Sequence, residues 1–267
     1  MLRFGILSVL ILVNCFSSMA QKPVTAVIGA FSNEVKLLED SLKNKKVVLI
    51  KGIRFMTGKL RNKNVVIALT GVGKVNAAMT TTLILSRWQP QKLIFTGIAG
   101  GLNPNLQPGD LVIAKATAQH DYGFIKNTEF LSEPTRNALD YSLNPFFFKA
   151  DSILLQTAQR VANNVPYQST NTKNRKPVVL TGVIVTGDVF VNSAEKSAQF
   201  IKTFGADATE MEGAAVAQVC YHFKTPCLVI RSISDNANAE AHLDMKTFLQ
   251  VAAYNSANLV LRILEEM

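Results

Sequence analysis

The sequence predicts a single α/β domain with a mixed central β-sheet that is flanked by helices. Strand-like and helix-like segments alternate along almost all of the 267 residues, and no internal repeat is evident. That alternation is typical of sheets covered by helices. The composition agrees with it, because 48% hydrophobic and 18% charged residues are usual for a globular protein with a sizeable core.

The first twenty residues differ in character from the rest. Arg3 is followed by a short apolar run, Phe4 to Val13, and then by small residues that include Ser18 and Ala20. A positive start, a short apolar core and small residues at the cleavage site are typical of a secretory signal peptide. The apolar run is also too short to span a bilayer comfortably. We therefore expect residues 1 to 20 to be removed after Ala20.

The expected mature chain is one domain, residues 21 to 267, exported with the periplasm as its destination. Lipid attachment at Cys15 is the weaker alternative, because Asn14 is an atypical residue before a lipoprotein cysteine. The rest of the chain contains no segment that predicts a membrane span either.

The first half of the mature chain predicts a strand, a helix, a three-stranded meander and a second helix. Val35, Leu38 and Leu42 fall on one helical face. Gly or polar residues separate the three strands of the meander. The predicted elements are strand Thr25 to Ala30, helix Glu34 to Leu42, strands Val47 to Lys51, Arg54 to Leu60 and Asn64 to Thr70, and helix Lys74 to Trp88.

The second half continues the alternation after one region that is hard to assign. Residues 121 to 150 have mixed composition with two prolines and three consecutive phenylalanines, which predicts a long excursion. We expect Asp244 to be the N-cap of a long closing helix. The predicted strands are Lys92 to Gly97, Asp110 to Lys115, Val178 to Val185 and Pro226 to Ser232. The predicted helices are Asp151 to Asn163, Ser193 to Thr203, Gly213 to Phe223 and Asp244 to Glu265.

The charge balance does not point to a nucleic-acid partner. Lys and Arg outnumber Asp and Glu by 28 to 19, which gives a formal net charge of +9. The basic residues look dispersed, and the densest cluster is Lys173 to Lys176 in a polar loop. We therefore expect ordinary solvated surface rather than a binding face.

The sequence contains no recognisable metal or cofactor site. Cys220 and Cys227 lack the CxxC spacing of a redox or zinc site and are expected to be packing residues, and the 3 histidines are scattered. The glycine-rich turns Thr70 to Val75 and Thr96 to Leu102 match neither a Walker loop nor a dinucleotide fingerprint. We therefore expect neither a metal nor a cofactor.

Three acidic residues occupy positions where α/β sheets bind ligands. Glu34 follows the first strand, Glu212 precedes a helix of small residues, and Asp235 ends an apolar strand. Each alone could serve as a helix-end charge or a turn cap. Together they are candidates for one site, because ligands bind outside the carboxyl ends of strands.

At these residues the sequence resembles the 5′-methylthioadenosine/S-adenosylhomocysteine nucleosidases, within the nucleoside phosphorylase superfamily. The resemblance covers nearly everything after the signal segment, in the family order, and three of its segments contain the acids. It implies a nucleoside phosphorylase-like three-layer sandwich and a homodimer. The matching segments are Val27 to Val35, Gly71 to Val75, Phe95 to Leu102, Pro108 to Ile113, Thr186 to Asn192, Glu210 to Gly213 and Val229 to Asp235.

The resemblance also implies roles for the acids. Glu34 would orient and deprotonate the attacking water, and Asp235 would deliver a proton to N7 of the purine. Glu212 would accept hydrogen bonds from the ribose 2′- and 3′-hydroxyls, with Met211 against the sugar. The chemistry fits these roles, because cleavage of the C1′–N9 bond passes through an oxocarbenium-like transition state that needs a protonated leaving group and a placed water.

The remaining site residues follow from the same resemblance. Phe190 would stack on the base while the backbone of Val191 pairs with its edge, and Arg231 would lie close to the ribose and Asp235. The other residues expected around the substrate are Val72, Ile98, Ala99 and Gly100.

Several alternatives stay open at this point. The loop from Phe31 to Glu34 has no cation where phosphorylases hold phosphate with an arginine, which favours water as the nucleophile. The competing hypotheses are a futalosine-type or plain purine nucleosidase, a phosphorylase that binds phosphate elsewhere, and an exported nucleoside-binding protein. Ile98 and Met245 depart from the family pattern, so the preference for a 5′-thio group depends on resemblance alone.

Overall fold

The structure is a computed structural model that describes residues 22–170 and 175–267. The predicted signal peptide, with Cys15, lies outside these residues, and so do Lys173 and Asn174. The prediction of cleavage after Ala20 therefore remains a prediction.

The centre of the molecule is a ten-stranded mixed sheet. Nine strands follow the order β11-β10-β6-β12-β5-β1-β4-β3-β2, and the tenth, β9, pairs with β6. The meander β2, β3 and β4 is antiparallel, whereas β1 pairs in parallel with β4 and β5. The strands of this sheet are β1 (Val24–Gly29), β2 (Lys43–Ile50), β3 (Ile53–Leu60), β4 (Lys63–Leu69), β5 (Lys92–Gly101), β6 (Leu111–Gln119), β9 (Phe148–Lys149), β10 (Val179–Thr186), β11 (Ala208–Glu210) and β12 (Cys227–Asp235).

One half of the sheet closes on itself. The short strand β11 pairs with β10 on one side and with the end of β5 on the other, where Thr209 lies opposite Gly100. The five strands β5, β12, β6, β10 and β11 therefore form a closed, barrel-like ring. This closure brings the end of β11 next to the end of β5, and the candidate site lies there.

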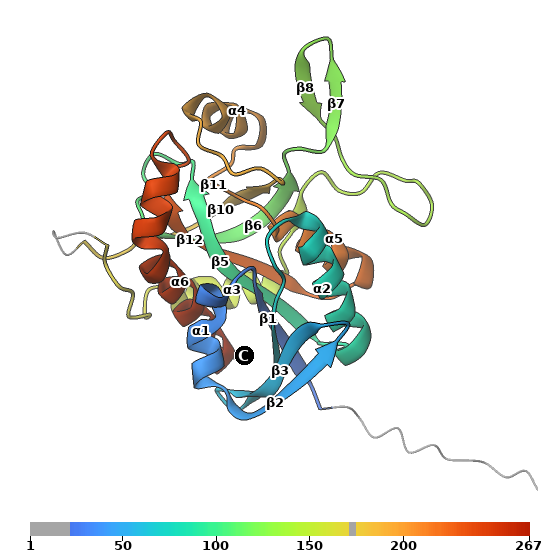
Figure 1. The fold of residues 1–267 in the computed structure, drawn as a ribbon, viewed down its shortest axis with the longest axis vertical. Helices are drawn as coiled ribbons and strands as arrows, with labels where there is room; N and C mark the ends of the chain where they lie inside the picture. The colour runs from blue at the N-terminus through green and yellow to red at the C-terminus, as the bar shows by residue number, and fades with distance from the viewer. Residues whose placement is uncertain (1–21, 171–174) are drawn as a thin grey trace, which may run out of the picture.

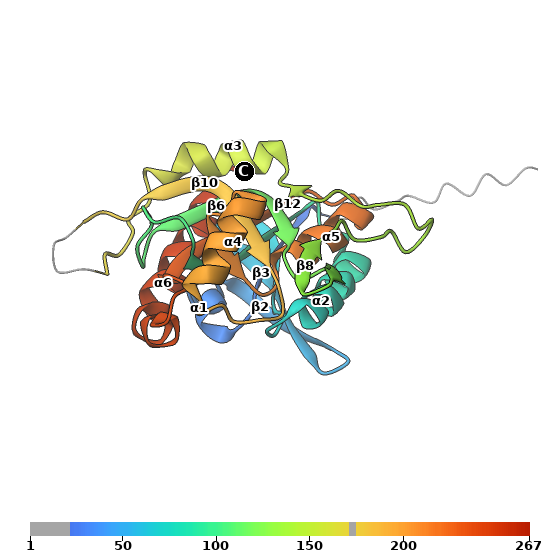
Figure 2. The ribbon, with the colours of Figure 1, turned by 90° about the horizontal axis from the view of Figure 1, so that it is seen from above.

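Helices cover both faces of the sheet, as the sequence predicted (Figures 1 and 2). One core contains Leu38 of α1, Leu154 of α3 and Leu261 of α6, while Ile84 of α2 and Val216 of α5 belong to the core on the opposite face. The helices are α1 (Ser32–Ser41), α2 (Lys74–Trp88), α3 (Ser152–Ala162), α4 (Ala194–Phe204), α5 (Gly213–Phe223) and α6 (Ala241–Glu266). No helix in the described part of the chain is long and apolar enough to cross a membrane.

The predicted start of the last helix was wrong. Helix α6 begins at Ala241 after Glu240, and Asp244 lies inside its first turn. The amide of Asp244 already donates to the carbonyl of Glu240, so it cannot be the residue that precedes the helix. The turn that starts the helix comes from Asn238, whose carbonyl accepts the amide of Ala241.

The region that the sequence left as an excursion contains a hairpin. Strands β7 (Gly123–Lys126) and β8 (Glu129–Ser132) pair with each other and project from the body of the molecule (Figure 1). Their two-residue turn begins at Asn127, whose φ of 58° is the left-handed conformation that such turns require. Strands of four residues give too little alternation to be recognised among prolines and aromatics.

Candidate active site

Ten of the eleven site residues predicted from the resemblance line one cavity of about 340 Å³. The cavity lies at the carboxyl-terminal ends of β5, β11 and β12 and beside the start of α1. The predicted residues that line it are Glu34, Val72, Ile98, Ala99, Gly100, Phe190, Val191, Met211, Glu212 and Asp235. The fold therefore joins segments that are up to two hundred residues apart in the chain.

Glu34 is held as an acceptor of backbone hydrogen bonds. It lies in the first turn of α1 and is 2% exposed. One carboxylate oxygen accepts the amides of Ala30 and Phe31, and the other accepts the amide of Ile98 at 2.9 Å. Burial raises the pKa of Glu34, while the nearby Arg231 guanidinium and these three amides lower it.

Glycine makes room for this carboxylate. A Cβ at Gly97 would lie 2.6 Å from Glu34 Oε1 and 3.0 Å from a guanidinium nitrogen of Arg231. No real side chain makes contacts that short with backbone-anchored groups, so a glycine is required at this position of β5.

Asp235 ends β12 and is also buried, with 2% exposure. The hydroxyl of Ser234 donates to Oδ2 at 2.7 Å, and the amide of Ala237 donates to Oδ1 at 2.9 Å. Burial raises its pKa, and the Ser234 hydrogen bond opposes that rise. Gly100 is needed here as well, since a Cβ on it would lie 2.8 Å from Oδ1.

Glu210 and Glu212 surround the N-terminus of α5. The carboxylate of Glu210 accepts the amides of Glu212 and Gly213 and the hydroxyl of Thr186, so it caps the helix. Glu212 accepts the amide of Gly73 at 2.9 Å from the glycine turn after β4. Burial, followed by the charge of Glu210, raises the pKa of Glu212 to about 8.

Arg231 is the predicted site residue that does not line the cavity. It lies underneath, 1% exposed, with its guanidinium 2.6 Å from Glu210 and 3.9 Å from Glu212 and stacked 4.0 Å from the ring centre of Phe95. Its contacts are thus with the acids, and it can affect a ligand only by holding and neutralising them.

The remaining wall of the cavity is apolar. Phe190 is 46% exposed and meets His242 edge-on with ring centres 6.0 Å apart, so this wall stands partly in solvent. Met211, Met245 and Leu249 complete the apolar surface. A flat aromatic at the rim with aliphatic and thioether groups behind it suits a heterocyclic base and an apolar substituent.

Sequence reasoning gave no role to several residues of this site. Ser234 and Glu210 both stood inside recognised segments, yet their hydrogen bonds to Asp235 and to the start of α5 depend on strand ends that only the fold brings together. The hydroxyl that supports Asp235 comes from Ser234, whereas Ile98 contributes its backbone amide to Glu34. The other lining residues without a predicted role are Phe31, Val189, Thr209 and Leu249.

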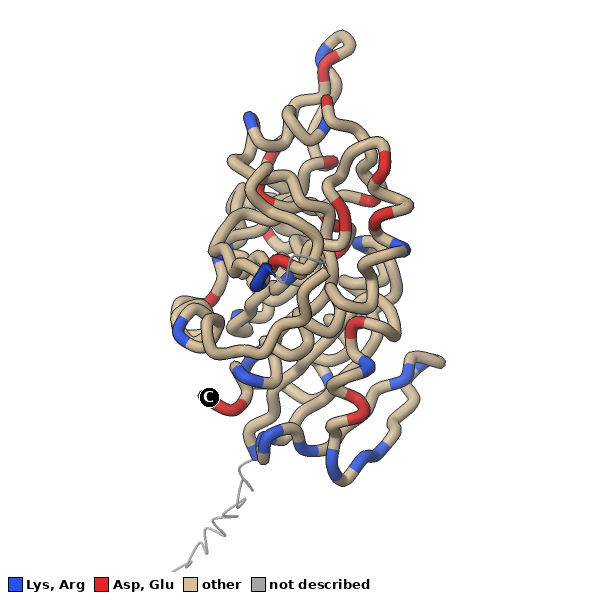
Figure 3. The backbone as a smooth tube through the Cα atoms, turned by 90° about the vertical axis from the view of Figure 1, so that its left-hand side faces the viewer, with Lys and Arg blue, Asp and Glu red and all other residues tan. Residues whose placement is uncertain are grey.

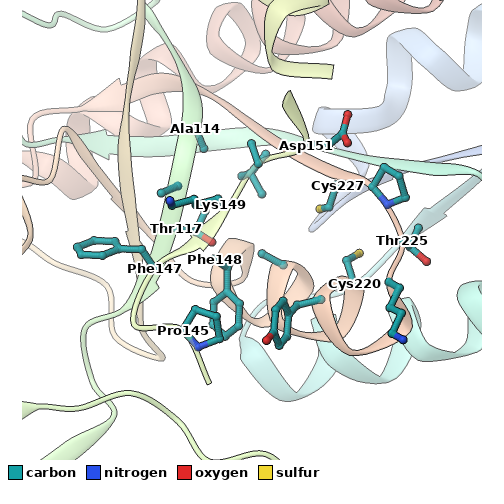
Figure 4. Close-up of a pocket in the computed structure, with 17 residues that line it drawn as sticks. Ala114, Thr117, Pro145, Phe147, Phe148, Lys149, Asp151, Cys220, Thr225 and Cys227 are labelled. Atoms are coloured by element: carbon teal, nitrogen blue, oxygen red, sulfur yellow. The ribbon is translucent and has the colours of Figure 1, made fainter. Parts of the chain in front are cut away.

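A second cavity, of about 670 Å³, lies away from these acids, between β6, β9 and α5 (Figure 4). Its one acid, Asp151, is engaged as the N-cap of α3 through the amide of Leu154. Cys220 and Cys227 line it as free thiols, and a hydrogen bond between them and burial raise the pKa of Cys220. A raised pKa disfavours a nucleophilic thiolate at Cys220, and the cluster of acids lies in the other cavity, so we place the chemistry there.

No group of three or more His, Cys, Asp or Glu side chains within residues 22–170 and 175–267 is arranged to hold a metal ion.

Residues 24–265 match the model of the phosphorylase superfamily. A 5′-methylthioadenosine/S-adenosylhomocysteine nucleosidase of Bacillus thuringiensis (strain Al Hakam) is 36% identical over 244 residues, which cover 91% of this chain and 98% of that protein.

Two solved structures show how far the similarity extends in three dimensions. A 5′-methylthioadenosine/S-adenosylhomocysteine nucleosidase of Neisseria meningitidis, in complex with methylthio-immucillin-A, has a TM-score of 0.77 and 37% identity, covering 91% of this chain and 99% of that one. Futalosine hydrolase of Helicobacter pylori strain 26695 has a TM-score of 0.77 and 32% identity, covering 92% and 98%.

Proposed function

The chain belongs to the 5′-methylthioadenosine/S-adenosylhomocysteine nucleosidase family of the phosphorylase superfamily, and from this premise we propose how its own residues perform the reaction. The enzyme hydrolyses the N-glycosidic bond of 5′-methylthioadenosine or S-adenosylhomocysteine and releases adenine. The observation that supports the residue roles best is the meeting of Glu34, Glu212 and Asp235 in one cavity.

The carboxylate of Glu34 takes a proton from the attacking water as the water oxygen bonds to C1′. The C1′–N9 bond breaks, and Asp235 gives its proton to N7, so adenine leaves as a neutral molecule. Glu34 then releases its proton to solvent and Asp235 takes one up, which restores both residues. Each residue has an environment suited to its role: three backbone amides and Arg231 favour the carboxylate at Glu34, whereas Asp235 is buried without a cation.

Glu212 binds the ribose in this proposal. Glu212 lies at the start of α5 and accepts the amide of Gly73. From there its carboxyl group presents an acceptor to the 2′- and 3′-hydroxyls. A carboxyl group can accept these hydrogen bonds in either protonation state, and the bonds strengthen when Glu212 ionises, which its pKa of about 8 places above neutral pH.

Water is favoured over phosphate as the nucleophile by the charges around Glu34. The loop from Phe31 to Glu34 has no cation, and the buried guanidinium of Arg231 is already engaged by Glu210 at 2.6 Å. A phosphate dianion beside Glu34 would therefore meet an acid without compensation. Phosphorolysis is the alternative that this arrangement disfavours.

The phosphate requirement is a direct test. Purified protein incubated with methylthioadenosine in phosphate-free buffer should release adenine and methylthioribose, with a rate unchanged by added phosphate. Formation of methylthioribose 1-phosphate, or a strict need for phosphate, would contradict the proposal. Futalosine and adenosine assayed in parallel rank the alternatives for the 5′ group, because Met245 and Leu249 provide only apolar surface to it.

Glu34→Gln tests whether the cavity is catalytic or only binds nucleosides. The amide keeps the size of the side chain but cannot take a proton, so turnover should fall by about 10² to 10⁴. Binding of adenine, measured by calorimetry, should remain within a few-fold of the original. Unchanged turnover would remove Glu34 from the mechanism, whereas adenine binding without turnover in the original protein would favour a nucleoside-binding protein.

We propose that the enzyme is a homodimer whose contact surface includes the outer faces of α2 and α5 and the β7–β8 hairpin, which lie on one side of the molecule (Figures 1 and 2). Apolar side chains are unusually exposed there: Val75 by 77%, Ile125 by 71% and Tyr221 by 51%. Light scattering after size exclusion should give twice the chain mass, and Ile125→Lys should shift it to the monomer mass.

Export with the periplasm as destination is likewise our proposal, based on residues 1 to 20. Intact mass of the processed protein should correspond to residues 21 to 267. A mass that begins at Cys15 with added acyl chains would show the lipid-anchored alternative instead.

A further inference from the structure

The basic excess of the chain is concentrated in the β2–β3–β4 meander. Residues 43 to 63 contain eight Lys or Arg and no Asp or Glu, a formal charge of +8 within a chain whose total is +9. This group of basic residues is larger than the cluster from Lys173 to Lys176. Blue Lys and Arg segments gather along the meander at one end of the molecule (Figure 3).

Most of these charges have no acidic partner. Arg54 pairs with Glu39 and Arg61 with Glu265, but the six lysines of the meander form no ion pair within the described residues. They are Lys43, Lys45, Lys46, Lys51, Lys59 and Lys63. Lys43 and Lys59 even lie directly opposite each other on neighbouring strands, an arrangement of like charges that destabilises a sheet.

The basic side chains surround a small hollow. A cavity of about 180 Å³ is lined by Ser41, Lys43, Lys59, Leu60, Arg61 and Asn62. Beside it, Gly58 lets β2 and β3 approach closely, because a Cβ there would lie 2.5 Å from the carbonyl oxygen of Lys43. The ammonium groups of Lys43 and Lys59 suit a phosphate group at this hollow, whereas the guanidinium of Arg61, which also lines it, is paired with Glu265 at 2.9 Å.

The hollow lies on the end of the molecule opposite the active site. Lys63 begins β4, next to the start of β1, and Asn64 binds the carbonyl of Pro23 through its side chain. Lys22, the first described residue, is exposed beside it, and Lys92 begins β5 at the same level. The catalytic cavity is at the carboxyl ends of these strands, so a surface bound to the basic end would leave the active site open to solvent.

Apolar side chains accompany the lysines. Val47 and Leu49 are 58% and 69% exposed and share a face of the edge strand β2 with Lys45. Edge lysines also protect a sheet from pairing with other chains, but that role explains neither the lysines of β3 and β4 nor the absence of acids. Cations interspersed with exposed aliphatic groups match the interface of a bilayer better than they match a nucleic-acid backbone.

We propose that the basic end of the β2–β3–β4 meander docks the enzyme on the surface of an anionic phospholipid bilayer, with a headgroup phosphate in the hollow beside Lys43 and Lys59. Lys22 and Lys92, which lie at the same end of the strands as the hollow, are then on the membrane side, whereas Val47 and Leu49 lie farther along β2 toward its hairpin with β3. The docking is electrostatic, so it weakens as salt screens the charges over about 10 Å at 0.1 M.

Vesicle sedimentation of the purified protein tests the proposal. Binding to vesicles of phosphatidylcholine with 30% phosphatidylglycerol should exceed binding to pure phosphatidylcholine, and should be lost at 0.5 M salt. The triple variant Lys43→Gln, Lys59→Gln, Lys63→Gln should bind about 100-fold more weakly, since each basic residue near an anionic surface contributes about fivefold. Its hydrolysis of methylthioadenosine should be unchanged, which shows that it is folded.

A matched triple variant provides the control. Lys149→Gln, Lys196→Gln, Lys202→Gln removes the same charge from other surfaces, on β9 and α4, and should weaken vesicle binding by less than threefold. Equal losses in both triple variants, or equal binding to neutral and anionic vesicles, would overturn the proposal. Binding to heparin or duplex DNA without binding to vesicles would also overturn it, in favour of a soluble polyanion.

Discussion

Gly97→Ala tests whether the position of the Glu34 carboxylate determines the rate. The alanine Cβ would lie 2.6 Å from Glu34 Oε1, and ordinary contact begins at 3.4 Å, so the carboxylate must move by about 0.8 Å. Movement away from β5 stretches the 2.9 Å hydrogen bond from the Ile98 amide beyond its useful length. Arg231, whose guanidinium would be 3.0 Å from the same Cβ, prevents the alanine from leaning aside.

The expected loss follows from the role of Glu34 as a general base. Such a base contributes about 10² to 10⁴ to the rate, and misplacement by about 1 Å costs on the order of 10²-fold. We therefore expect kcat to fall about 100-fold. The KM for methylthioadenosine should stay within about threefold, because Glu212 and Phe190 rather than Glu34 are proposed to hold the nucleoside. Adenine release under saturating substrate measures both constants.

Gly101→Ala is the matched control on the same strand. Its Cβ would meet the γ2 methyl of Ile233 at 3.1 Å and the backbone oxygen of Asp235 at an ordinary 3.4 Å, so a shift of a few tenths of an ångström relieves it and no carboxylate is contacted. Turnover of this variant should remain within about threefold. A folded Gly97→Ala enzyme with nearly unchanged kcat would refute the reasoning, since Glu34 would then tolerate displacement.

Three further predictions concern the other buried charges. The pKa of Glu212 is about 8 in the fold against an ordinary 4.5. Between these two pH values the folded protein binds one more proton than the unfolded chain, so the free energy of unfolding falls as pH rises from 4.5 to 8. Glu212→Gln should flatten this dependence by a few kcal/mol in urea unfolding at pH 5 and pH 8. Ser234→Ala removes a hydrogen bond that lowers the pKa of Asp235, so the basic limb of kcat/KM should move to higher pH while kcat falls about tenfold. Arg231→Met leaves Glu210 buried without its partner and should destabilise the fold by about 3 to 5 kcal/mol.

Each of these predictions has an outcome that would contradict it. Equal stability of the original protein at pH 5 and pH 8 would show that Glu212 ionises freely in the fold. If the basic limb of the kcat/KM profile does not move in Ser234→Ala, a group other than Asp235 donates the proton. For Arg231→Met the control is Arg54→Met, which breaks an exposed pair with Glu39 and should cost less than about 1 kcal/mol. Similar costs for both would contradict the buried pairing.

The long elements of the fold could be predicted because their patterns are local. The apolar face of α1 and the buried run of β1 have periods that sequence alone reveals. Strand β11 has three residues, and its pairing with both β10 and β5 arises from closure of the sheet, which no local pattern encodes. The start of α6 was misplaced for a similar reason, since Asp244 is an acceptable cap by residue type alone.

The catalytic acids could be predicted because strand ends in α/β folds converge, and resemblance supplied their roles. What could not be predicted is how each acid is held. Ser234 reaches Asp235 only after β12 ends in an irregular pairing with β5, and Glu210 meets Arg231 from a strand that was not recognised. Hydrogen-bond partners at a site depend on such distances between strands rather than on residue type.

The balance of charge in the cavity explains why two like groups can serve as base and acid. Among the described residues, Glu34, Glu210, Glu212 and Asp235 are all buried there, and Arg231 is the one guanidinium buried with them. One cation cannot neutralise four carboxylates, so the cavity holds protons near neutral pH. Arg231 acts on Glu34, Glu210 and Glu212 but is absent from the interactions that set the pKa of Asp235. Asp235 is therefore buried without a cation beside it, which favours its protonated form, and it is the residue placed to give up a proton when the purine leaves.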